Sequence, residues 1–558
     1  MADFDLVLRG GQLVDGTGAA RRRADVAVAG GRIASVGEVR GRGARELDAG
    51  GLLVAPGFID IHTHYDAQVF WDRMLSISPW HGVTTAVLGN CGFGVAPTRA
   101  EHRRLILQTL ENVEGMSLDA LWAGLGEDWP FTTFPEFLAA IEARGCAINV
   151  GAFIGHTPVR MFVMGEASTE REASAAEIEQ MQALVQDALA AGALGFATSK
   201  SPTHVGFEGR PVPSRVAAHA ELQALCDCLG RAGHGVLQAT IGRGLFIDEL
   251  AAIARRIGRP VTWTALLGGM LGPDGHRDVL RSAALQAEGI QVVPQVSCRP
   301  LVLEFDFARP FPFESMSLFK PVSAADRAGR KRIYADPEFR AAFRQRSLGG
   351  GLAGRWDKMH VSYSPTDRAL EERNVAEAAA ERDVHPVDLV LDLALASDLA
   401  ARFRSAVLND DEAIVAELLV HPAVTLGLSD AGAHASQLCD ANFATHLLGH
   451  WVREKRVLEL EQAVRLLTSR SADLLGIADR GRIIEGLAAD LVVFDPDQVG
   501  CSPLRRVHDL PRGADRLVSD AFGIHAVVVN GVVLRERGED RLDPAGTLPG
   551  RLVRGGQS

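Results

Sequence analysis

Two histidines near the start of the chain have the spacing of metal ligands. His62 and His64 directly follow residues 58–61, which are mostly apolar and of strand-forming type, behind a Pro-Gly turn. Because side chains alternate along a strand, both imidazoles leave the same face. Two imidazoles on one face can bind one divalent ion, although two ordinary polar residues at a strand end have the same pattern. We favour the metal interpretation because an acidic residue closes a second predicted strand far along the chain.

A cysteine follows the next predicted strand. Cys91 stands between glycines after residues 84–89. A thiolate at a strand end can approach a metal ion closely. The alternative is a small buried core residue, and the nearby pair of histidines favours the ligand.

The acidic residue is Asp430, at the end of the predicted strand 424–430. A carboxylate there can bind a metal and accept the proton of a bound water, or it can cap the helix that follows. His434, four residues later, is a donor that could polarise a scissile carbonyl, or a solvated loop residue. We therefore predict one Zn²⁺-like ion and two catalytic residues, Asp430 and His434. The predicted ligands are His62, His64, Cys91 and Asp430.

Three further residues are candidates for binding the substrate. Lys200 follows the predicted strand 194–198, where it could pair with a substrate carboxylate or bridge metals as a carboxylated lysine. Arg299 lies near another strand end and suits a bidentate grip on a carboxylate. His156 is the third candidate. Lysine and arginine are more often simply solvated.

These residues need a scaffold of parallel strands. The middle of the chain alternates predicted strands and helices, which is typical of a parallel α/β core. Eight strands is the number that closes a (β/α)8 TIM barrel, although residues 360–363 are a ninth candidate. Residues 300–358 do not fit this alternation and are predicted to be an inserted loop or lid. The eight predicted strands are residues 58–62, 84–89, 147–153, 194–198, 235–240, 260–264, 290–295 and 424–430.

Both ends of the chain read as short strands and turns. Asn530-Gly531 is a strong hairpin signal. We predict one β-domain made of residues 1–55 and 481–540, with the barrel, residues 56–480, inserted in it. The polar tail, residues 541–558, is predicted to be loose.

The bulk properties favour a soluble, cytoplasmic protein with two or more domains. The chain has 558 residues, enough for several domains, and a net charge of -12, which argues against nucleic acid or an anionic membrane as partner. It has no 18-residue apolar run and no signal-peptide pattern at its N-terminus. Seven scattered cysteines suit a reducing compartment. A homo-oligomer is left open.

Several motifs together resemble one enzyme family. The segment from Pro56 to His64 is similar to the opening metal motif of the amidohydrolase superfamily. Four other motifs resemble its N-acyl-D-amino-acid deacylase (D-aminoacylase) branch. The resemblance implies a metal-dependent hydrolase with a TIM barrel and a small β-sandwich, and a cysteine thiolate as the metal ligand in place of a carboxylated lysine. The other motifs are Gly89-Asn90-Cys91-Gly92, Gly155-His156, Asn374-Val375-Ala376-Glu377 with His385-Pro386-Val387-Asp388, and Gly427-Leu428-Ser429-Asp430.

The sequence departs from that branch at two strands. The branch brings one ligand histidine on each of the fifth and sixth strands, but residues 237–241 and 262–266 contain none. The surviving ligands suffice for one ion, and His156, His204 or His360 are open as substitutes. We predict an amidohydrolase that cleaves a linear C–N amide bond, of an N-acyl amino acid or a related small amide. The alternatives are a cyclic amide or lactam hydrolase on the same fold and a catalytically degenerate barrel that binds a small molecule.

Overall fold

The structure is a computed structural model that describes residues 2–269, 275–313, 316–348 and 354–556. The chain divides into two compact units. The first comprises residues 1–299, 411–435 and 439–558, and the second comprises residues 300–410 and 436–438.

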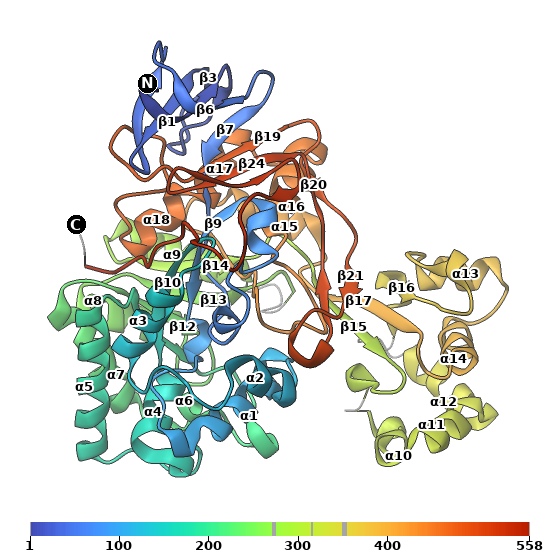
Figure 1. The fold of residues 1–558 in the computed structure, drawn as a ribbon. Coiled ribbons are helices and arrows are strands. Elements are labelled where there is room, and N and C mark those ends of the chain that lie inside the picture. The colour runs from blue at the N-terminus through green and yellow to red at the C-terminus, as the bar shows by residue number, and fades with distance from the viewer. Residues whose placement is uncertain (1, 270–274, 314–315, 349–353, 557–558) are drawn as a thin grey trace. The chain divides into compact units, whose positions relative to one another are not determined.

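An eight-stranded parallel sheet is the centre of the first unit (Figure 1). Its strands follow one another in chain order, so that each strand pairs with the next one along the sequence. Nearly all their residues are buried, as expected for parallel strands that are covered by helices. The sheet contains all eight predicted strands and confirms the mixed α/β class. Its members are β8 (Phe58–Asp60), β9 (Val83–Leu88), β10 (Asn149–Gly155), β11 (Gly195–Ser199), β12 (Val236–Thr240), β13 (Val261–Leu266), β14 (Val292–Val296) and β18 (Thr425–Leu426).

Helices connect the strands and cover the sheet. α5, α7 and α8 pack in sequence against one another on its outside (Figure 1). Glycines end several of these helices in the left-handed conformation, for example Gly192 after α5 and Gly233 after α7. The principal helices of this unit are α1 (Arg103–Glu114), α3 (Phe134–Arg144), α4 (His156–Met164), α5 (Ala175–Ala191), α7 (His219–Ala232), α8 (Ile247–Ile257), α9 (Gly275–Ala287), α15 (Glu412–Val420), α17 (Leu460–Leu467) and α18 (Ser469–Leu475).

Strands from the two chain ends lie in one sheet. In this seven-stranded sheet β7 of the N-terminal part pairs antiparallel with β19 of the C-terminal part. The predicted hairpin is present, with Asn530 at φ 45° and Gly531 at φ 81° between β24 and β25. The seven strands are β2 (Gln12–Leu13), β3 (Arg22–Arg23), β7 (Leu53–Pro56), β19 (Leu491–Phe494), β24 (Ile524–Val529), β25 (Val532–Glu536) and β26 (Glu539–Asp540). A second sheet contains β1 (Phe4–Arg9), β4 (Asp25–Ala29), β5 (Arg32–Gly37) and β6 (Gly43–Asp48).

The C-terminal tail is held in place rather than loose. The amide of Val150 donates to the carbonyl of Arg551 (3.0 Å), and the amide of Val553 donates to the carbonyl of Val150 (2.8 Å). The side chains of Leu548 and Val553 are buried. The polar composition of the tail concealed these two apolar anchors, which let its backbone pair beside β10.

The second unit replaces the predicted loop at residues 300–358 with a small folded body. It contains an antiparallel sheet of β15 (Leu301–Asp306), β17 (Arg402–Leu408) and β16 (Met359–Tyr363), which was the ninth strand candidate. Its helices include α11 (Arg327–Ala335), α12 (Pro337–Ser347), α13 (Val375–Glu381) and α14 (Pro386–Ala396). The phenylalanines that interrupted the strand–helix alternation form its core, where Phe307, Phe313 and Phe343 are fully buried.

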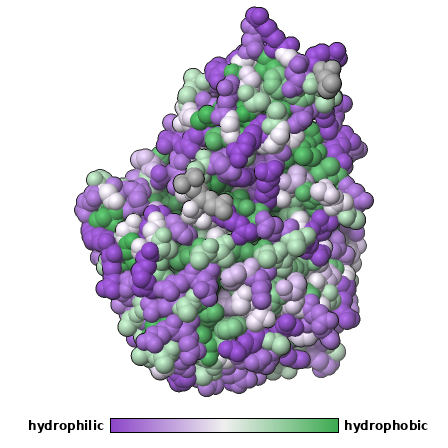
Figure 2. Space-filling model, turned by 60° about the vertical axis from the view of Figure 1, so that its left-hand side comes forward, coloured by the Kyte–Doolittle hydropathy of each residue, from purple (hydrophilic) through white to green (hydrophobic). Residues whose placement is uncertain are grey.

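The face of the molecule shown in Figure 2 is mostly polar. Hydrophilic residues cover most of the face seen in Figure 2, with smaller hydrophobic areas between them. Among the described residues, no helix combines the length and the apolar character that crossing a bilayer requires.

Candidate metal site

Two buried histidines follow the first strand of the parallel sheet. Backbone bonds hold this segment on both sides, because the amide of Thr63 donates to Val87 (3.1 Å) and the amide of His64 donates to Ala431 (2.7 Å). The ring centroids of His62 and His64 lie 5.4 Å apart. The structure therefore places both imidazoles side by side, within the sheet rather than in solvent.

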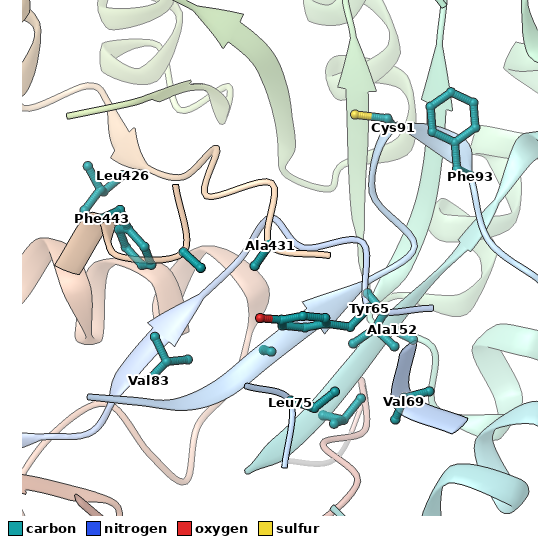
Figure 3. Packing of buried hydrophobic residues seen from close by; sticks show 14 of the residues in the cluster. Tyr65, Val69, Leu75, Val83, Cys91, Phe93, Ala152, Leu426, Ala431 and Phe443 are labelled. Atoms are coloured by element: carbon teal, nitrogen blue, oxygen red, sulfur yellow. The ribbon is translucent and has the colours of Figure 1, made fainter. Parts of the chain in front are cut away.

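Cys91 lies in the short 3-10 segment η3 (Asn90–Gly92) after β9, where Figure 3 shows it near Phe93. At Gly89 the chain turns with φ 80°, and a Cβ there would lie 2.1 Å from the carbonyl oxygen of Phe153, so only glycine fits. The Cys91 Sγ atom lies 3.4 Å from His62 Nε2. One ligand atom from each of His62, His64 and Cys91 lies within 4.8 Å of the others.

Asp430 approaches the same atoms from the loop after β18. Its Oδ1 atom lies 3.3 Å from His62 Nε2 and 3.7 Å from His64 Nε2. The residue before it, Ser429, ties this loop to the first strand, since its hydroxyl lies 2.6 Å from Asp60 Oδ2 and 2.9 Å from the carbonyl oxygen of His62. We call His62, His64, Cys91 and Asp430 the ligand cluster.

The two histidines of the ligand cluster favour the ionised forms of Asp430 and Cys91. Burial by itself would raise the pKa of the Asp430 carboxyl, but His64 and His62 hold that pKa below its ordinary value. Burial also opposes ionisation of the Cys91 thiol, yet the same two histidines lower its pKa to about 7. Near neutral pH the cluster therefore offers a carboxylate and a substantial fraction of thiolate, which are the ionised forms that a metal ion binds.

His434 shares the loop of Asp430. The amide of Ala433, the residue before it, donates to the carbonyl of Asp430 (2.9 Å), and His434 has a left-handed backbone with φ 48°. Its electrostatic influence helps to lower the pKa of Asp430. The side chain of His434 is half-buried.

Lys200 directly follows β11 and is held by the end of α6 (Pro213–Val216). Its Nζ atom donates to the backbone carbonyls of Arg215 (3.3 Å) and Ala217. Burial lowers the pKa of the Lys200 ammonium to about 8. The lysine is thus largely charged at neutral pH, and it contacts the neutral backbone carbonyls of Arg215 and Ala217.

Arg299 forms a buried ion pair three residues after β14. Its Nε atom donates to Asp440 Oδ1 at 2.8 Å. Burial raises the pKa of the Asp440 carboxyl to about 6 although Arg299 opposes that shift. The structure thus gives the predicted carboxylate-binding arginine a partner within the protein.

His156 lies in a separate buried cluster. Its Nε2 is 2.9 Å from Glu221 Oε1 and its Nδ1 is 2.8 Å from Thr198 Oγ1, so both ring nitrogens have protein partners. Arg160 also pairs with Glu221, and it donates to the carbonyls of Ser168 and Arg171. We call His156, Arg160 and Glu221 the buried ion-pair cluster. It joins α4 to α7, and in this arrangement His156 presents no ring nitrogen to a substrate.

Of the three substitute histidines, His204 lies beside the ligand cluster. His156 is occupied as described, and His360 belongs to β16 of the second unit. His204 follows β11, where its Nδ1 is 2.7 Å from Ser199 Oγ and its ring centroid is 5.1 Å from that of Phe93. Burial lowers the pKa of His204 to about 3, and His64 and His434 add to this effect.

The two strands that lack the expected histidines carry amide and hydroxyl side chains instead. Gln238 and Thr240 lie on β12, and Thr262 and Thr264 lie on β13. Gln238 contacts the backbone of Cys91, and Gln295 of β14 contacts the ring of His62. Sequence reasoning missed both glutamines. The signal for them was one buried polar residue in the middle of each apolar strand.

Two imidazoles, a thiol and a carboxylate thus converge at the carboxyl ends of parallel strands, and this arrangement defines a metal-dependent hydrolase. The chain belongs to the amidohydrolase family, whose model matches residues 45–289 and 341–535. The resemblance stated from the motifs is confirmed.

Individual relatives agree over nearly the whole chain. The chain is 30% identical to an N-acyl-D-glutamate deacylase of Alcaligenes xylosoxydans xylosoxydans, over 99% of this chain and 96% of that protein. A crystal structure of N-acyl-D-glutamate deacylase from Bordetella bronchiseptica, with zinc and a phosphonate inhibitor, matches with a TM-score of 0.64 and 26% identity, covering 99% of both chains. A structure of D-aminoacylase, described as having a binuclear metal center with one-metal activation and second-metal attenuation, matches with a TM-score of 0.65 and 27% identity. It covers 99% of this chain and 100% of that one.

The protein is therefore a metal-dependent amidohydrolase, a hydrolase that acts on linear carbon–nitrogen bonds other than peptide bonds. The cyclic amide hydrolase and the degenerate binding barrel, which were the alternatives, are not favoured.

Proposed function

We propose that this protein deacylates N-acyl amino acids, including those of the D configuration, and that it uses one zinc ion bound by the ligand cluster. The products are a carboxylic acid and the free amino acid. The observation that carries the proposal is the convergence of Asp430 Oδ1 and Cys91 Sγ on His62 Nε2. The names of the relatives support the substrate class.

The donor set fits zinc. Imidazole nitrogen, thiolate sulfur and carboxylate oxygen are all zinc ligands, and ligands about 2.0–2.3 Å from a tetrahedral ion lie about 3.3–3.8 Å apart. The distances from Cys91 Sγ to His62 Nε2 (3.4 Å) and from Asp430 Oδ1 to His62 Nε2 (3.3 Å) and His64 Nε2 (3.7 Å) lie within that range. One ion is favoured over two because β12 and β13 carry glutamine and threonine where a second ion would need histidines.

We also propose that the parallel sheet closes into a complete (β/α)8 barrel. A parallel bridge between Thr63 and Ala431, after β8 and β18, supports closure between the first and last strands. The shared hydrophobic core of strands from both chain ends supports a small β-sandwich, with members such as Leu8 and Val26 from one end and Leu491 and Val528 from the other.

The reaction uses three side chains around the scissile bond. With four protein ligands, a bound zinc would take water as a fifth ligand, lower the pKa of that water toward neutrality and polarise a carbonyl. Asp430, which the neighbouring histidines keep ionised, accepts the proton of the attacking water and returns it to the leaving amine nitrogen. His434 donates a hydrogen bond to the developing oxyanion. Lys200 pairs with the carboxylate of the amino acid, since its charge faces neutral carbonyls, whereas Arg299 is already compensated by Asp440.

The test combines metal analysis with a substrate panel. We expect one zinc per native chain and release of amino acid from N-acetyl derivatives of one or both hands. His62→Ala should lose zinc and turnover while it keeps its circular dichroism spectrum. Two zinc ions per chain would contradict the single-ion site. A native protein that binds no zinc after reconstitution, or a His62→Ala variant with native rates, would overturn the proposal.

A further inference from the structure

Two buried glutamines stand directly behind the ligand cluster. Gln238 lies on β12 and Gln295 on β14, on either side of β13, and the exposed fraction of each is at most 1%. Each side chain accepts one hydrogen bond from a metal-ligand residue and donates one to a threonine of β13. Gln238 belongs to β12, one of the two strands that lack the ligand histidines, and both threonines belong to the other, β13.

Gln295 determines which nitrogen of His62 is protonated. Its Oε1 lies 2.8 Å from His62 Nδ1, while its Nε2 donates to Thr262 Oγ1 at 3.2 Å. Thr262 in turn donates to the carbonyl of Val293 at 3.0 Å. This chain of bonds orients the amide with its oxygen toward His62. Because an amide oxygen only accepts, the Nδ1 of His62 carries the proton, and the lone pair of Nε2 is left for a metal ion.

Gln238 supports the backbone of Cys91. Its Oε1 accepts the Cys91 amide at 2.7 Å, and its Nε2 donates to Thr264 Oγ1 at 3.4 Å. Thr264 donates onward to Thr240 Oγ1 at 3.2 Å. Cys91 has φ 55°, a conformation that non-glycine residues rarely adopt. The bond from Gln238 therefore holds the turn that directs the thiol toward His62.

We propose that Gln238 and Gln295 are positioning residues that present Cys91 and His62 to a single zinc ion, and that two threonines of β13 anchor them. This inference rests on the single-zinc site of the proposed function. Neutral acceptors suit such a site, because the charges of zinc, the Cys91 thiolate and the Asp430 carboxylate already sum to zero. Carboxylates in place of the two amides would add buried negative charge.

The experiment measures zinc affinity by chelator competition and the thiolate-to-metal charge-transfer band of the cobalt-substituted protein. We expect Gln295→Leu to weaken zinc binding by about 10–100-fold, the usual effect of losing such a partner. Gln295→Glu keeps an acceptor for His62 but adds one buried negative charge, so it should lose less zinc affinity than Gln295→Leu. Gln238→Leu should shift the charge-transfer band, because it releases the backbone that carries the thiolate.

Gln286→Leu is the matched control. Gln286 of α9 donates to the carbonyls of Val292 and Ala423 and contacts no member of the ligand cluster, so its loss should leave zinc affinity and the cobalt band unchanged. If Gln295→Leu does not fold, Thr262→Val replaces it in the experiment. Thr262→Val removes only the residue that anchors the Gln295 amide, and it should also lower the zinc affinity.

The outcomes separate the two proposals. Native protein that binds zinc, with Gln295→Leu or Thr262→Val equal to it in affinity and in cobalt spectrum, would overturn the positioning role alone. Equal losses in the Leu and Glu variants of Gln295 would also overturn it, because the acceptor would then be irrelevant. Native protein without zinc would defeat the proposed function itself.

Discussion

The ligand cluster and the buried ion-pair cluster contain similar side chains. They differ in whether the polar atoms of these side chains already satisfy one another. In the buried ion-pair cluster both nitrogens of His156 and both oxygens of Glu221 have protein partners, and Arg160 balances the carboxylate. In the ligand cluster, the Cys91 sulfur lies 3.4 Å and an Asp430 oxygen 3.3 Å from the Nε2 of His62. A network whose groups satisfy one another is structural, whereas converging acceptors and anions call for a cation. Three substitutions test this contrast.

The largest effect is expected in the ligand cluster. Asp430→Asn removes the proton acceptor but leaves two imidazoles and the thiolate for the metal. Turnover should fall by about 10²–10⁴-fold, the usual contribution of general acid–base catalysis, while the zinc content stays near native. Steady-state rates and elemental analysis on the same preparation measure this. A native rate in the variant would remove Asp430 from the mechanism.

An intermediate effect is expected in the buried ion-pair cluster, and on stability instead of chemistry. Glu221→Ala leaves the Arg160 guanidinium buried without its anion, which costs about 3–5 kcal/mol of unfolding free energy. Denaturant titration measures the loss, and the protein that remains folded should bind zinc as the native protein does. Glu221→Gln keeps hydrogen-bond acceptance and should lose less. A fully stable Glu221→Ala variant that has lost zinc would reverse the contrast between the clusters.

The smallest effect concerns Lys200 and pH. Its pKa, lowered to about 8 by burial, means that the ammonium loses its proton as the pH rises from 7 to 9. If Lys200 binds the substrate carboxylate, KM should rise across this window by about tenfold, which corresponds to about 1.4 kcal/mol. Lys200→Arg stays charged and should flatten the profile, and Lys200→Met should raise KM at every pH. If the KM of the native protein does not change with pH, Lys200 does not bind the substrate and only holds the backbone at Arg215 and Ala217.

Local patterns were enough to predict the strands and the candidate ligands. His62 and His64 share a face because strand side chains alternate, and Asp430 was conspicuous because a carboxylate closes an apolar strand. The eight strands of the parallel sheet were predicted for the same reason, since each is a short apolar run buried on both faces.

Predictions from composition were wrong where the packing partners are distant in sequence. The phenylalanines of residues 300–358 resembled an irregular loop, but they form a core together with Phe403 and Val390, which come later in the chain. The tail was judged by its glycines and charges, although Leu548 and Val553 anchor it beside Val150, about 400 residues earlier.

The amino-acid sequence was sufficient to predict the mixed α/β class and the family, and it proposed the donor types, because these depend on short-range periodicity and on motifs of a few residues. Long-range contacts decided whether each of these side chains already has a hydrogen-bond partner within the protein. Nothing in the sequence around His156 distinguishes it from a substrate ligand, and Glu221 removes that role from 65 residues away. Nothing around His62 indicates its protonated nitrogen, and Gln295 selects it across 233 residues. Hydrogen-bond satisfaction is a property of neighbours in space, and the fold alone supplies those neighbours.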